Sequence, residues 1–521
     1  MGTENLSPSG NNKRIAKSTL MLYFRMILTM AVSLYTSRVI LNTLGVVDYG
    51  IYNVVGGFVL MLGFLNSAMS SGTQRFLAFE IGKGDSAGFG RVFLMSINIH
   101  GLIGLAVLLV AETLGLWFVN NHLVIPAERL NAANWVFQFA VFSFIVTVLS
   151  VPYNAAIIAH ERMSVFAWFS ILEVSLKLAI VFLLDLTDFD KLKVYSVLMF
   201  AVALIIRFIY GLYCQKYIEQ TKFKFFWNHA LFKTLLSYAG WNLWGNVAVV
   251  LAIQGTNILL NLFFGPVVNA AKAVSDQVRG AVNGFVVNFQ MAVNPQIVKS
   301  YAKHDVVYMH ALVTQSAKVS FFLMLLLTMP VLFRTEYLLG VWLVEVPENA
   351  PIFIQLTLVM LLIDSISGSL MTASQATGKI RIYQSVVGGF LLLNVPLSYL
   401  SLKVGYGPNA VLVVGIAIAF FAFFLRLLII CPLINLSIIS FLKQIVQRML
   451  PTTVVCILFA FILSELFNGM NLTEFLIFVF FLTLGNLFII ILFGLNKVER
   501  NLVKKYVLYF LKRSLKCVLF F

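Results

Sequence analysis

Apolar stretches of about 20 residues follow one another along almost the whole chain, separated by short polar connections. A helix of that length spans the hydrocarbon core of a bilayer, so each stretch predicts a membrane helix. The pattern predicts fourteen helices, near residues 18–44, 50–72, 92–118, 132–156, 163–184, 194–214, 232–262, 266–297, 311–333, 351–376, 382–402, 408–431, 449–468 and 472–495. The connections are too short to hold a folded domain outside the membrane.

The composition agrees with an all-α integral membrane protein, because 60% of the 521 residues are hydrophobic and only 11% are charged. The polar start runs into a long apolar segment without a small-residue cleavage pattern, which predicts a retained first helix rather than a signal peptide. The four cysteines have no metal-ligand spacing, so we expect neither a metal site nor a disulfide.

The distribution of Lys and Arg predicts the orientation of the chain. With the N-terminus inside, the predicted cytoplasmic segments hold 24 of the 37 Lys and Arg residues, and the opposite side holds five. Cytoplasmic loops of membrane proteins carry this excess, so both termini are expected in the cytoplasm. The same placement, rather than nucleic-acid binding, accounts for the net charge of +16. The basic segment 497–521 is expected to form an amphipathic helix on the cytoplasmic membrane surface.

A weak internal repeat recurs at an offset of about 220 residues. The sequence LNTLG at 41–45 recurs as LNLFFG at 260–265, and TQRFLAFEIGKGD at 73–85 parallels PQIVKSYAKHD, which ends at Asp305. Six predicted helices separate the copies, so the two halves have the same orientation, a plan in which transporters place the cargo between the halves. The repeat predicts six-helix bundles at 1–215 and 216–435, an added helix pair at 436–496 and the tail at 497–521.

Cations outnumber acids inside the predicted membrane helices. A charge in the hydrocarbon is costly, so it normally faces a protein interior or a water-filled path, and an excess of cations favours an anionic cargo. We expect Arg38, Lys318 and Arg426 to extend toward the nearer membrane surface.

Two of the other cations lie four residues from an acid on the same helix. Lys177 follows Glu173, and Asp276 follows Lys272, so both lysines are expected to form ion pairs. Because arginine can bind a phosphate with two parallel hydrogen bonds, we expect the remaining cations to be the main phosphate-binding residues. These are Arg25, Arg207 and Arg279, with Lys272 and Lys177 as further candidates.

Polar residues, most of them amides, form two stripes, each spaced so that its members lie on one face of a predicted helix. One stripe lies on the predicted helix 266–297 and consists of Asn269, Lys272, Asp276, Arg279, Asn283, Gln290 and Asn294. The other lies on 232–262 and consists of Asn242, Asn246, Gln254, Asn257 and Asn261, beside Trp241 and Trp244. Amides and aromatic rings suit sugar hydroxyls, although Asn and Gln also join packed membrane helices. We favour a water-filled path, with Asn242, Asn246, Asn257 and Asn283 as substrate-binding residues.

Asp364 lies in an apolar run with no basic residue nearby in the sequence. It is either a protonatable coupling site or the partner of a cation from another helix. We take Asp364 as an ion-coupling candidate, together with Asp276 and Glu173. His100 is expected to be a packed polar residue. Small residues such as Gly56 and Gly63 on the second predicted helix leave room either for cargo or for close helix approach, and we favour close approach.

The sequence resembles the bacterial polysaccharide-export flippases of the MOP superfamily, which are relatives of the MATE exporters. The resemblance is carried by RVILNTLGVVDYGIYNVVGGFV at 38–59, TQRFLAFEIGKGD at 73–85, LGVWLVEVP at 339–347, LLLNVPLSYLSL at 391–402 and GLNKVER at 494–500. It implies a bundle pair that alternates between inward-open and outward-open states. The implied cargo is a polyprenyl-diphosphate-linked oligosaccharide, moved from the cytoplasmic to the periplasmic leaflet of the inner membrane for surface polysaccharide such as O-antigen.

The resemblance also implies that membrane lipid, a polysaccharide polymerase and glycosyltransferases are partners, and that no cofactor is needed. A lipid II flippase of the same superfamily and a MATE-type ion-coupled exporter remain alternatives. A membrane glycosyltransferase or polymerase is less favoured, because the outer loops hold no paired carboxylates and basic residues that could form an active site.

Overall fold

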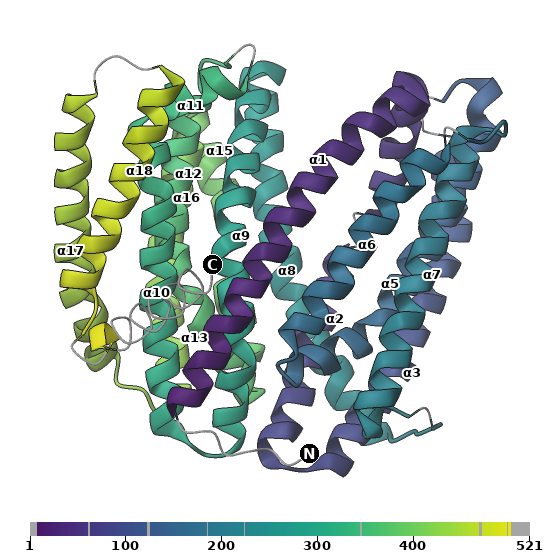
Figure 1. The fold of residues 1–521 in the computed structure, drawn as a ribbon, viewed down its shortest axis with the longest axis horizontal. Helices are drawn as coiled ribbons and strands as arrows, with labels where there is room; N and C mark the ends of the chain where they lie inside the picture. Colours follow the sequence, from purple (N-terminus) through teal and green to yellow (C-terminus); the bar gives the residue numbers. More distant parts are fainter. Residues whose placement is uncertain are drawn as a thin grey trace, which may run out of the picture. The chain divides into compact units, whose positions relative to one another are not determined.

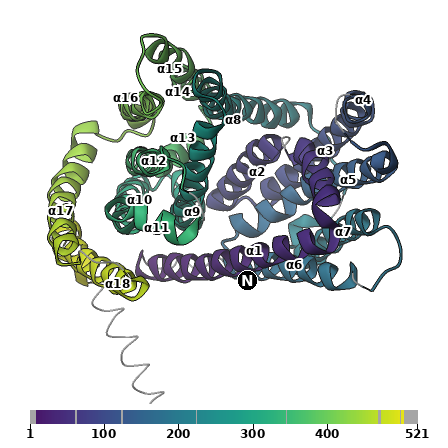
Figure 2. The same ribbon diagram turned by 90° about the horizontal axis from the view of Figure 1, so that it is seen from above.

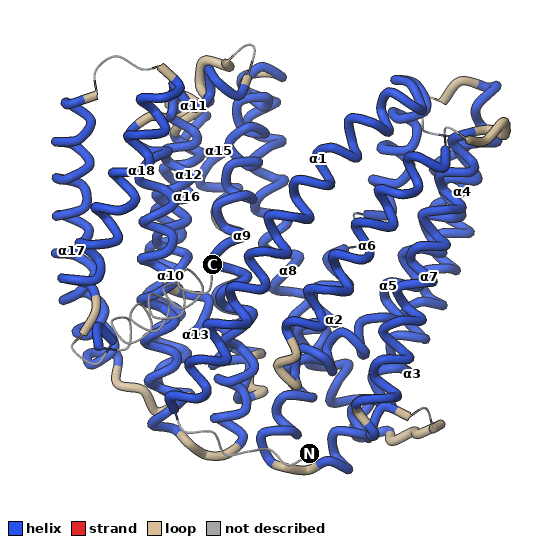
Figure 3. The backbone as a smooth tube through the Cα atoms, in the orientation of Figure 1, coloured by secondary structure: helices blue, strands red, loops and turns tan. Residues whose placement is uncertain are grey.

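The computed structural model describes residues 8–60, 63–121, 125–184, 186–222, 224–343, 346–467, 471–496 and 499–501. These parts of the chain are almost entirely helical and contain no strand (Figures 1 and 3). The predicted tail at 497–521 lies almost wholly outside the described residues, as does the side chain of Arg38, so both expectations stay predictions.

The helices follow one another as α1 Pro8–Leu60, α2 Gly63–Lys83, α3 Ser86–Val110, α4 Leu116–Asn121, α5 Leu130–Ala159, α6 Met163–Leu184, α7 Lys191–Tyr217, α8 His229–Phe264, α9 Pro266–Ala302, α10 Val306–Phe333, α11 Thr335–Trp342, α12 Ala350–Ser365, α13 Ser367–Thr377, α14 Arg381–Leu392, α15 Asn394–Lys403, α16 Ala410–Leu433, α17 Ile438–Leu466 and α18 Leu472–Ile489. The described residues of the fourteen predicted membrane helices are almost all helical. Two of them are broken, at Ile366 and at Leu393, and α17 begins well before the predicted start at 449.

Among the described residues, eleven helices are long and apolar enough to cross a membrane, or twelve if α12 and α13, bent by 40°, form one span. The two predicted spans that fail this test are 50–72 and 266–297. The span 50–72 is divided between α1 and α2, and the span 266–297 carries the polar stripe, which lowers its hydropathy. The structure is that of a multi-pass all-α membrane protein.

Contacts between residues divide the chain into two units. Unit 1 contains residues 1–250, 291–309 and 372–389, and unit 2 contains 251–290, 310–371 and 390–521. These units do not coincide with the predicted division after residue 215, because parts of α8, α9, α13 and α14 belong to unit 1. The two parallel six-helix bundles therefore stay a prediction.

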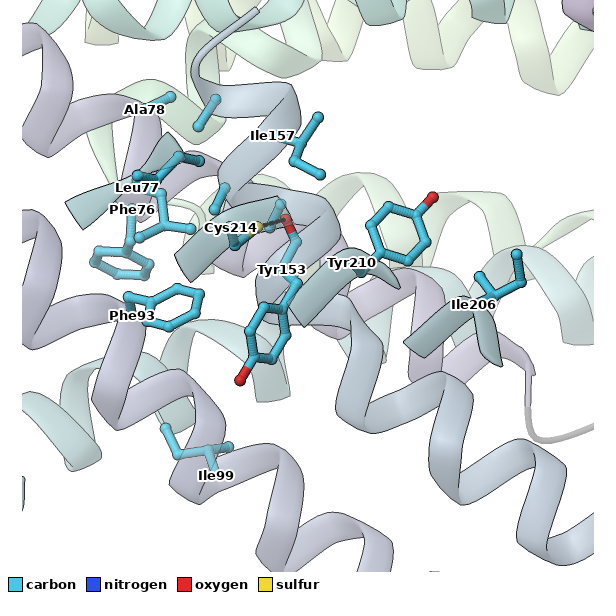
Figure 4. Packing of buried hydrophobic residues seen from close by; sticks show 14 of the residues in the cluster. Phe76, Leu77, Ala78, Phe93, Ile99, Tyr153, Ile157, Ile206, Tyr210 and Cys214 are labelled. Atoms are coloured by element: carbon cyan, nitrogen blue, oxygen red, sulfur yellow. Dashed lines mark hydrogen bonds between the residues drawn. The ribbon is translucent and has the colours of Figure 1, made fainter. Parts of the chain in front are cut away.

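The core of unit 1 is formed by aromatic and aliphatic side chains where α5 and α7 pack together. Figure 4 shows Phe93 and Tyr153 edge to face, with ring centres 5.2 Å apart, and the Cys214 thiol near the Tyr153 carbonyl. Tyr210 similarly meets Phe169 edge to face at 5.0 Å. Such aromatic pairs add to the stability gained from burying apolar surface.

At one end of unit 1, a guanidinium lies between two carboxylates and joins the segments that carry them. Arg129, just before α5, pairs with Asp48 of α1 and with Asp190, whose Oδ2 accepts a hydrogen bond at 2.9 Å. Partial burial raises the pKa of Asp190, but the hydrogen bonds from Arg129 outweigh it, so the pKa lies below its usual value. Asp190 also caps the N-terminus of α7, which fixes where that helix begins.

Helix α1 crosses unit 1 from one end to the other, and α2 crosses it in the opposite direction. Near the start of α1, Arg14 pairs with Glu161 at 2.5 Å, whereas Asp48 lies at the Arg129 end. At the end of α2, Gly82 packs directly on the backbone of Lys299, which pairs with Glu161. The two crossings agree with the two predicted helices, although α1 stays helical to Leu60 instead of ending at 44.

Candidate functional site

A cavity of about 320 Å³ lies in unit 1 among the end of α1, α2, α5, α6 and α7. Its wall is mostly apolar and aromatic, with a few hydroxyl and amide groups and one ion pair. It is lined by Tyr52, Gly56, Gly63, Asn66, Val136, Phe139, Ala140, Ser143, Phe144, Thr147, Glu173, Lys177, Ser196, Met199 and Ala203. An apolar cavity with a few polar groups is the usual form of a small-molecule or cofactor site.

The two glycines in the cavity wall leave space rather than allowing close helix contact. A Cβ atom built on Gly56 or on Gly63 would meet no atom within 4 Å. Of the two alternatives for these positions, open space rather than close helix approach is therefore the one that the structure supports. The sequence pattern was correct that the residues are small, but it could not show whether another helix or open space lies opposite them.

The ion pair in the cavity wall is the predicted one on α6. Lys177 Nζ donates to Glu173 Oε1 at 2.6 Å, and the two side chains are 36% and 38% exposed. The pairing is confirmed, and the pair brings no net charge to the cavity. It does place one donor group and one acceptor group side by side.

Arg207 lies on the α7 face that lines the cavity, one turn beyond Ala203. Its guanidinium lies 3.9 Å from the ring centre of Tyr153, within the range of a cation–π interaction. The side chain runs along α7 past Gly211, where a Cβ atom would lie 3.0 Å from Nη1. Arg207 is thus next to the cavity rather than in its wall.

Arg25 reaches the same part of unit 1 from α1. Its guanidinium lies 4.8 Å from the ring centre of Phe166, at the start of α6. Tyr210 on α7 interacts electrostatically with both Arg25 and Glu173. Arg25 and Arg207 therefore both lie near Tyr210 of α7.

The charged residues of the α9 stripe lie in unit 2. Lys272 is almost fully buried and pairs with Asp276, as predicted. Ser275, at the edge of this stripe, donates to Thr357 Oγ1 at 2.8 Å on α12. Arg279, one turn beyond Asp276, is half-buried.

Several amides of the two stripes join helices, as in the packing alternative. Gln384 donates to Asn242 Oδ1 at 3.2 Å, and Gln290 donates to Ser320 Oγ at 3.1 Å. Asn257 bonds within its own helix, donating to Gln254 at 3.2 Å. The remaining predicted amides, Asn246 and Asn283, are half-buried.

Asp364 has a cationic partner from another helix, which was one of the two interpretations of this residue. Arg426 Nη1 lies 3.4 Å from Asp364 Oδ1 and 3.1 Å from Ser367 Oγ, at the break between α12 and α13. Arg426 is 6% exposed, so the expectation that it extends to the membrane surface was wrong.

Lys318 is equally buried, and Glu499 accepts from its Nζ with both carboxylate oxygens at 2.6 Å. Glu499 follows the end of the last predicted membrane segment, so Lys318 extends toward that membrane surface as expected, and its charge is paired there.

His100 is a packed residue, as expected. It is 1% exposed, and its Nδ1 lies 2.6 Å from the carbonyl oxygen of Ser96 one turn earlier.

Sequence analysis missed a cluster around Glu161 in the turn between α5 and α6. The Glu161 side chain is 3% exposed and accepts from Arg14 and Gln296, each at 2.5 Å, and from Lys299. Burial and the nearby cations lower the pKa of the adjacent His160 to about 4. The donors come from helices far apart in sequence, so no local spacing indicated the cluster.

A second unpredicted contact lies at the end of α13. Arg75 of α2 donates to the carbonyl oxygens of Gln375 at 2.9 Å and Ala376 at 2.8 Å. Its guanidinium also lies 4.5 Å from the ring centre of Phe76. A cation at a helix C-terminus satisfies carbonyl groups that have no partner within the helix.

No protein-family model matches the sequence, and no curated protein is similar to it. The fold is similar to solved structures of transporters. A structure described as the outward-facing conformation of a multidrug resistance MATE family transporter of the MOP superfamily has a TM-score of 0.71 and 12% identity, covering 82% of this chain and 96% of that one.

A MOP superfamily transporter from Pyrococcus furiosus, whose description states that a binding pocket of reverse polarity suggests a different function, has a TM-score of 0.70, 13% identity and the same coverage. A MATE structure in a bent conformation has a TM-score of 0.71 and 12% identity, again over 82% of this chain and 96% of its own. The chain therefore has the fold of the MATE transporters of the MOP superfamily.

Proposed function

We propose that this chain is a membrane transporter that moves a polyprenyl-diphosphate-linked oligosaccharide from the cytoplasmic to the periplasmic leaflet by alternating access. The proposal rests on two arginines of the predicted membrane helices whose positive charge is not neutralised by an ion pair. Neither Arg207 nor Arg279 forms an ion pair with any acidic residue in the parts of the chain that the structure describes. Each can therefore offset the charge of a phosphate.

The cavity in unit 1 has the chemistry that a sugar needs. Ser143, Thr147 and Ser196 provide hydroxyl groups, and Tyr52 and Phe139 provide aromatic faces. Sugars bind by hydrogen bonds at their hydroxyls and by apolar contact at their ring faces. A diphosphate crossing a medium of low dielectric constant needs opposite charge, and arginine supplies it with directed donors.

The contacts around Glu161 and Arg75 support a closed gate at the predicted cytoplasmic end of unit 1. They join α1, α2 and the α5–α6 turn to α9 and α13, which lie in the predicted second half of the chain. A cargo entering from the cytoplasm needs α9 and α13 to separate from the first half. Opening then breaks the Glu161 ion pairs and the two Arg75 hydrogen bonds.

A MATE-type exporter of organic cations is the second candidate, and it has its own supporting observation. Glu173 lies in an aromatic cavity, which would suit a cation if Lys177 did not neutralise the carboxylate. The similar structures are described as a multidrug resistance transporter and as a transporter with a pocket of reverse polarity, so this fold accommodates pockets of different charge. Lipid II remains an alternative cargo because it carries the same diphosphate.

Reconstitution into proteoliposomes tests the proposal. We expect a fluorescent polyprenyl-diphosphate oligosaccharide to change leaflet in vesicles with the chain, and Arg207→Ala to abolish this movement because the phosphates lose a counter-charge. Lys216→Gln, which removes an exposed cation from the same helix, is the matched control and should transport normally.

The choice of cargo separates the candidates. Faster movement of lipid II than of the oligosaccharide would favour the lipid II alternative. Export of an organic cation with no movement of either lipid would contradict the proposal, as would full activity of Arg207→Ala.

A further inference from the structure

A second cavity, also of about 320 Å³, lies in unit 2 among α10, α17 and the segment that follows α18. Its lining differs from that of the cavity in unit 1, because polar side chains dominate it. The lining residues are Ala311, Thr314, Gln315, Lys318, Gln444, Gln447, Arg448, Asn496 and Glu499.

A buried ion pair forms the fixed wall of this cavity. Lys318 donates to both carboxylate oxygens of Glu499 at 2.6 Å, and the two side chains are 7% and 13% exposed. Asn496 holds Glu499 in place, because its backbone N–H donates to Glu499 Oε2 at 2.8 Å. An ammonium group has three N–H donors, and these two bonds leave one of them for a further acceptor.

The ion pair is neutral, so Arg448 gives the cavity a net charge of one positive unit. Arg448 is exposed, and the contact from its Nη1 to the Phe493 carbonyl oxygen is long, at 3.4 Å. A contact of that length is weak, so the guanidinium can turn toward a better acceptor. One positive charge surrounded by the amides of Gln315 and Gln447 matches a singly charged phosphodiester next to hydroxyl groups.

The position of the cavity along the helices matches the headgroup layer of a membrane. The predicted membrane segments end near 311, 449 and 495, and the lining residues lie at or close to all three ends. Phe493, whose carbonyl oxygen accepts from Arg448, has a side chain that is 48% exposed, and Leu450, two residues beyond Arg448 on α17, is 60% exposed. A soluble phosphate compound would have no contact with such side chains, whereas an acyl chain would cover them.

From these observations we propose that the cavity in unit 2 binds an anionic glycerophospholipid of the cytoplasmic leaflet. Arg448 and the third N–H of Lys318 contact the phosphodiester, the glutamine amides contact the headgroup hydroxyls, and an acyl chain lies along Leu450 and Phe493. The site is separate from the proposed transport function, since it contains neither Arg207 nor Arg279.

Lipid retention by the purified full-length chain tests the proposal. The chain is placed in nanodiscs of phosphatidylglycerol and phosphatidylcholine, and bound lipid is counted by native mass spectrometry. We expect preferential retention of phosphatidylglycerol, and about tenfold weaker retention in Arg448→Gln because a charge-assisted hydrogen bond is lost. Lys443→Gln removes an exposed charge from the same helix outside the cavity, and it should retain lipid like the unaltered chain.

Two results would overturn the proposal. One is equal retention by Arg448→Gln and Lys443→Gln, which would leave only general attraction between the basic surface and anionic lipid. The other is displacement of the lipid by millimolar glycerol phosphate, which would make a soluble phosphate compound the occupant. Gln447→Leu leaves the charge unchanged and should lower the preference for phosphatidylglycerol, and an unchanged thermal unfolding profile shows that each variant is folded.

Discussion

Glu161 and Asp364 are both carboxylates paired with cations inside helical units, yet their surroundings differ. Glu161 in unit 1 is 3% exposed and receives three donors from two other helices. Asp364 in unit 2 is 34% exposed and has one ion-pair contact, a long one of 3.4 Å to Arg426. The first carboxylate has nearly all its acceptor sites filled, whereas the second has several available to water.

The difference in exposure and bonding suits Glu161 to a structural role and Asp364 to a switching role. A carboxylate with several short charge-assisted bonds holds its neighbours together and releases them only when several bonds break at once. A partly exposed carboxylate with one long contact can exchange that partner for water or an ion while the surrounding helices stay in place. Asp364 is therefore the better candidate for ion coupling, and Glu161 for the gate.

The largest effect is expected from Glu161→Gln. The change leaves Arg14 and Lys299 beside a neutral amide, and breaking a buried ion pair in this way costs about 3–5 kcal/mol of stability. Thermal unfolding of the purified chain in detergent measures the loss. Glu219→Gln, which removes an exposed acid, should unfold like the original chain. Equal unfolding of the two variants would show that the Glu161 cluster contributes no stability.

Asp364→Asn is expected to cost less stability and to affect transport more. The amide still accepts a hydrogen bond, and Arg426 keeps its contact with Ser367, so we expect a loss of about 1–2 kcal/mol. Without a protonatable group, transport should no longer depend on a proton or sodium gradient, which vesicles with and without the gradient would measure. Unchanged gradient dependence would remove Asp364 from the coupling mechanism.

The smallest effect is a pH dependence at His160, next to Glu161. Burial and nearby cations lower the pKa of His160 to about 4, so between pH 4 and 6.5 the unfolded chain binds a proton that the folded chain does not. Stability should fall as the pH decreases through this window. His160→Gln should unfold with a smaller pH dependence than the original chain. An identical dependence would assign it to other groups.

Sequence patterns predicted the helices and the local ion pairs because both are set by residues close together in the chain. Lys177 and Glu173 lie one turn apart on α6, so their spacing alone brings them together. The boundaries of the two units, in contrast, depend on contacts between residues far apart in the sequence, which no local pattern predicts. Parts of α9 and α13 join unit 1 through Lys299, Arg75 and their partners.

The errors concern charges whose partners are distant in sequence. The buried ion pair of Lys318 was not predicted, because its partner Glu499 is 181 residues away in the sequence. The same holds for Arg426 and Asp364, which are 62 residues apart. Hydropathy shows where a cation is costly. Only the packing of helices shows how that cost is offset.

The bond between Lys318 and Glu499 limits how the C-terminus can be altered for practical work. A fluorescent protein or purification tag fused after Glu499 keeps both partners of this pair. A cut only a few residues earlier, after α18, would delete Glu499 and leave the buried ammonium of Lys318 without its carboxylate. A shortened version of this protein should therefore keep every residue through Glu499.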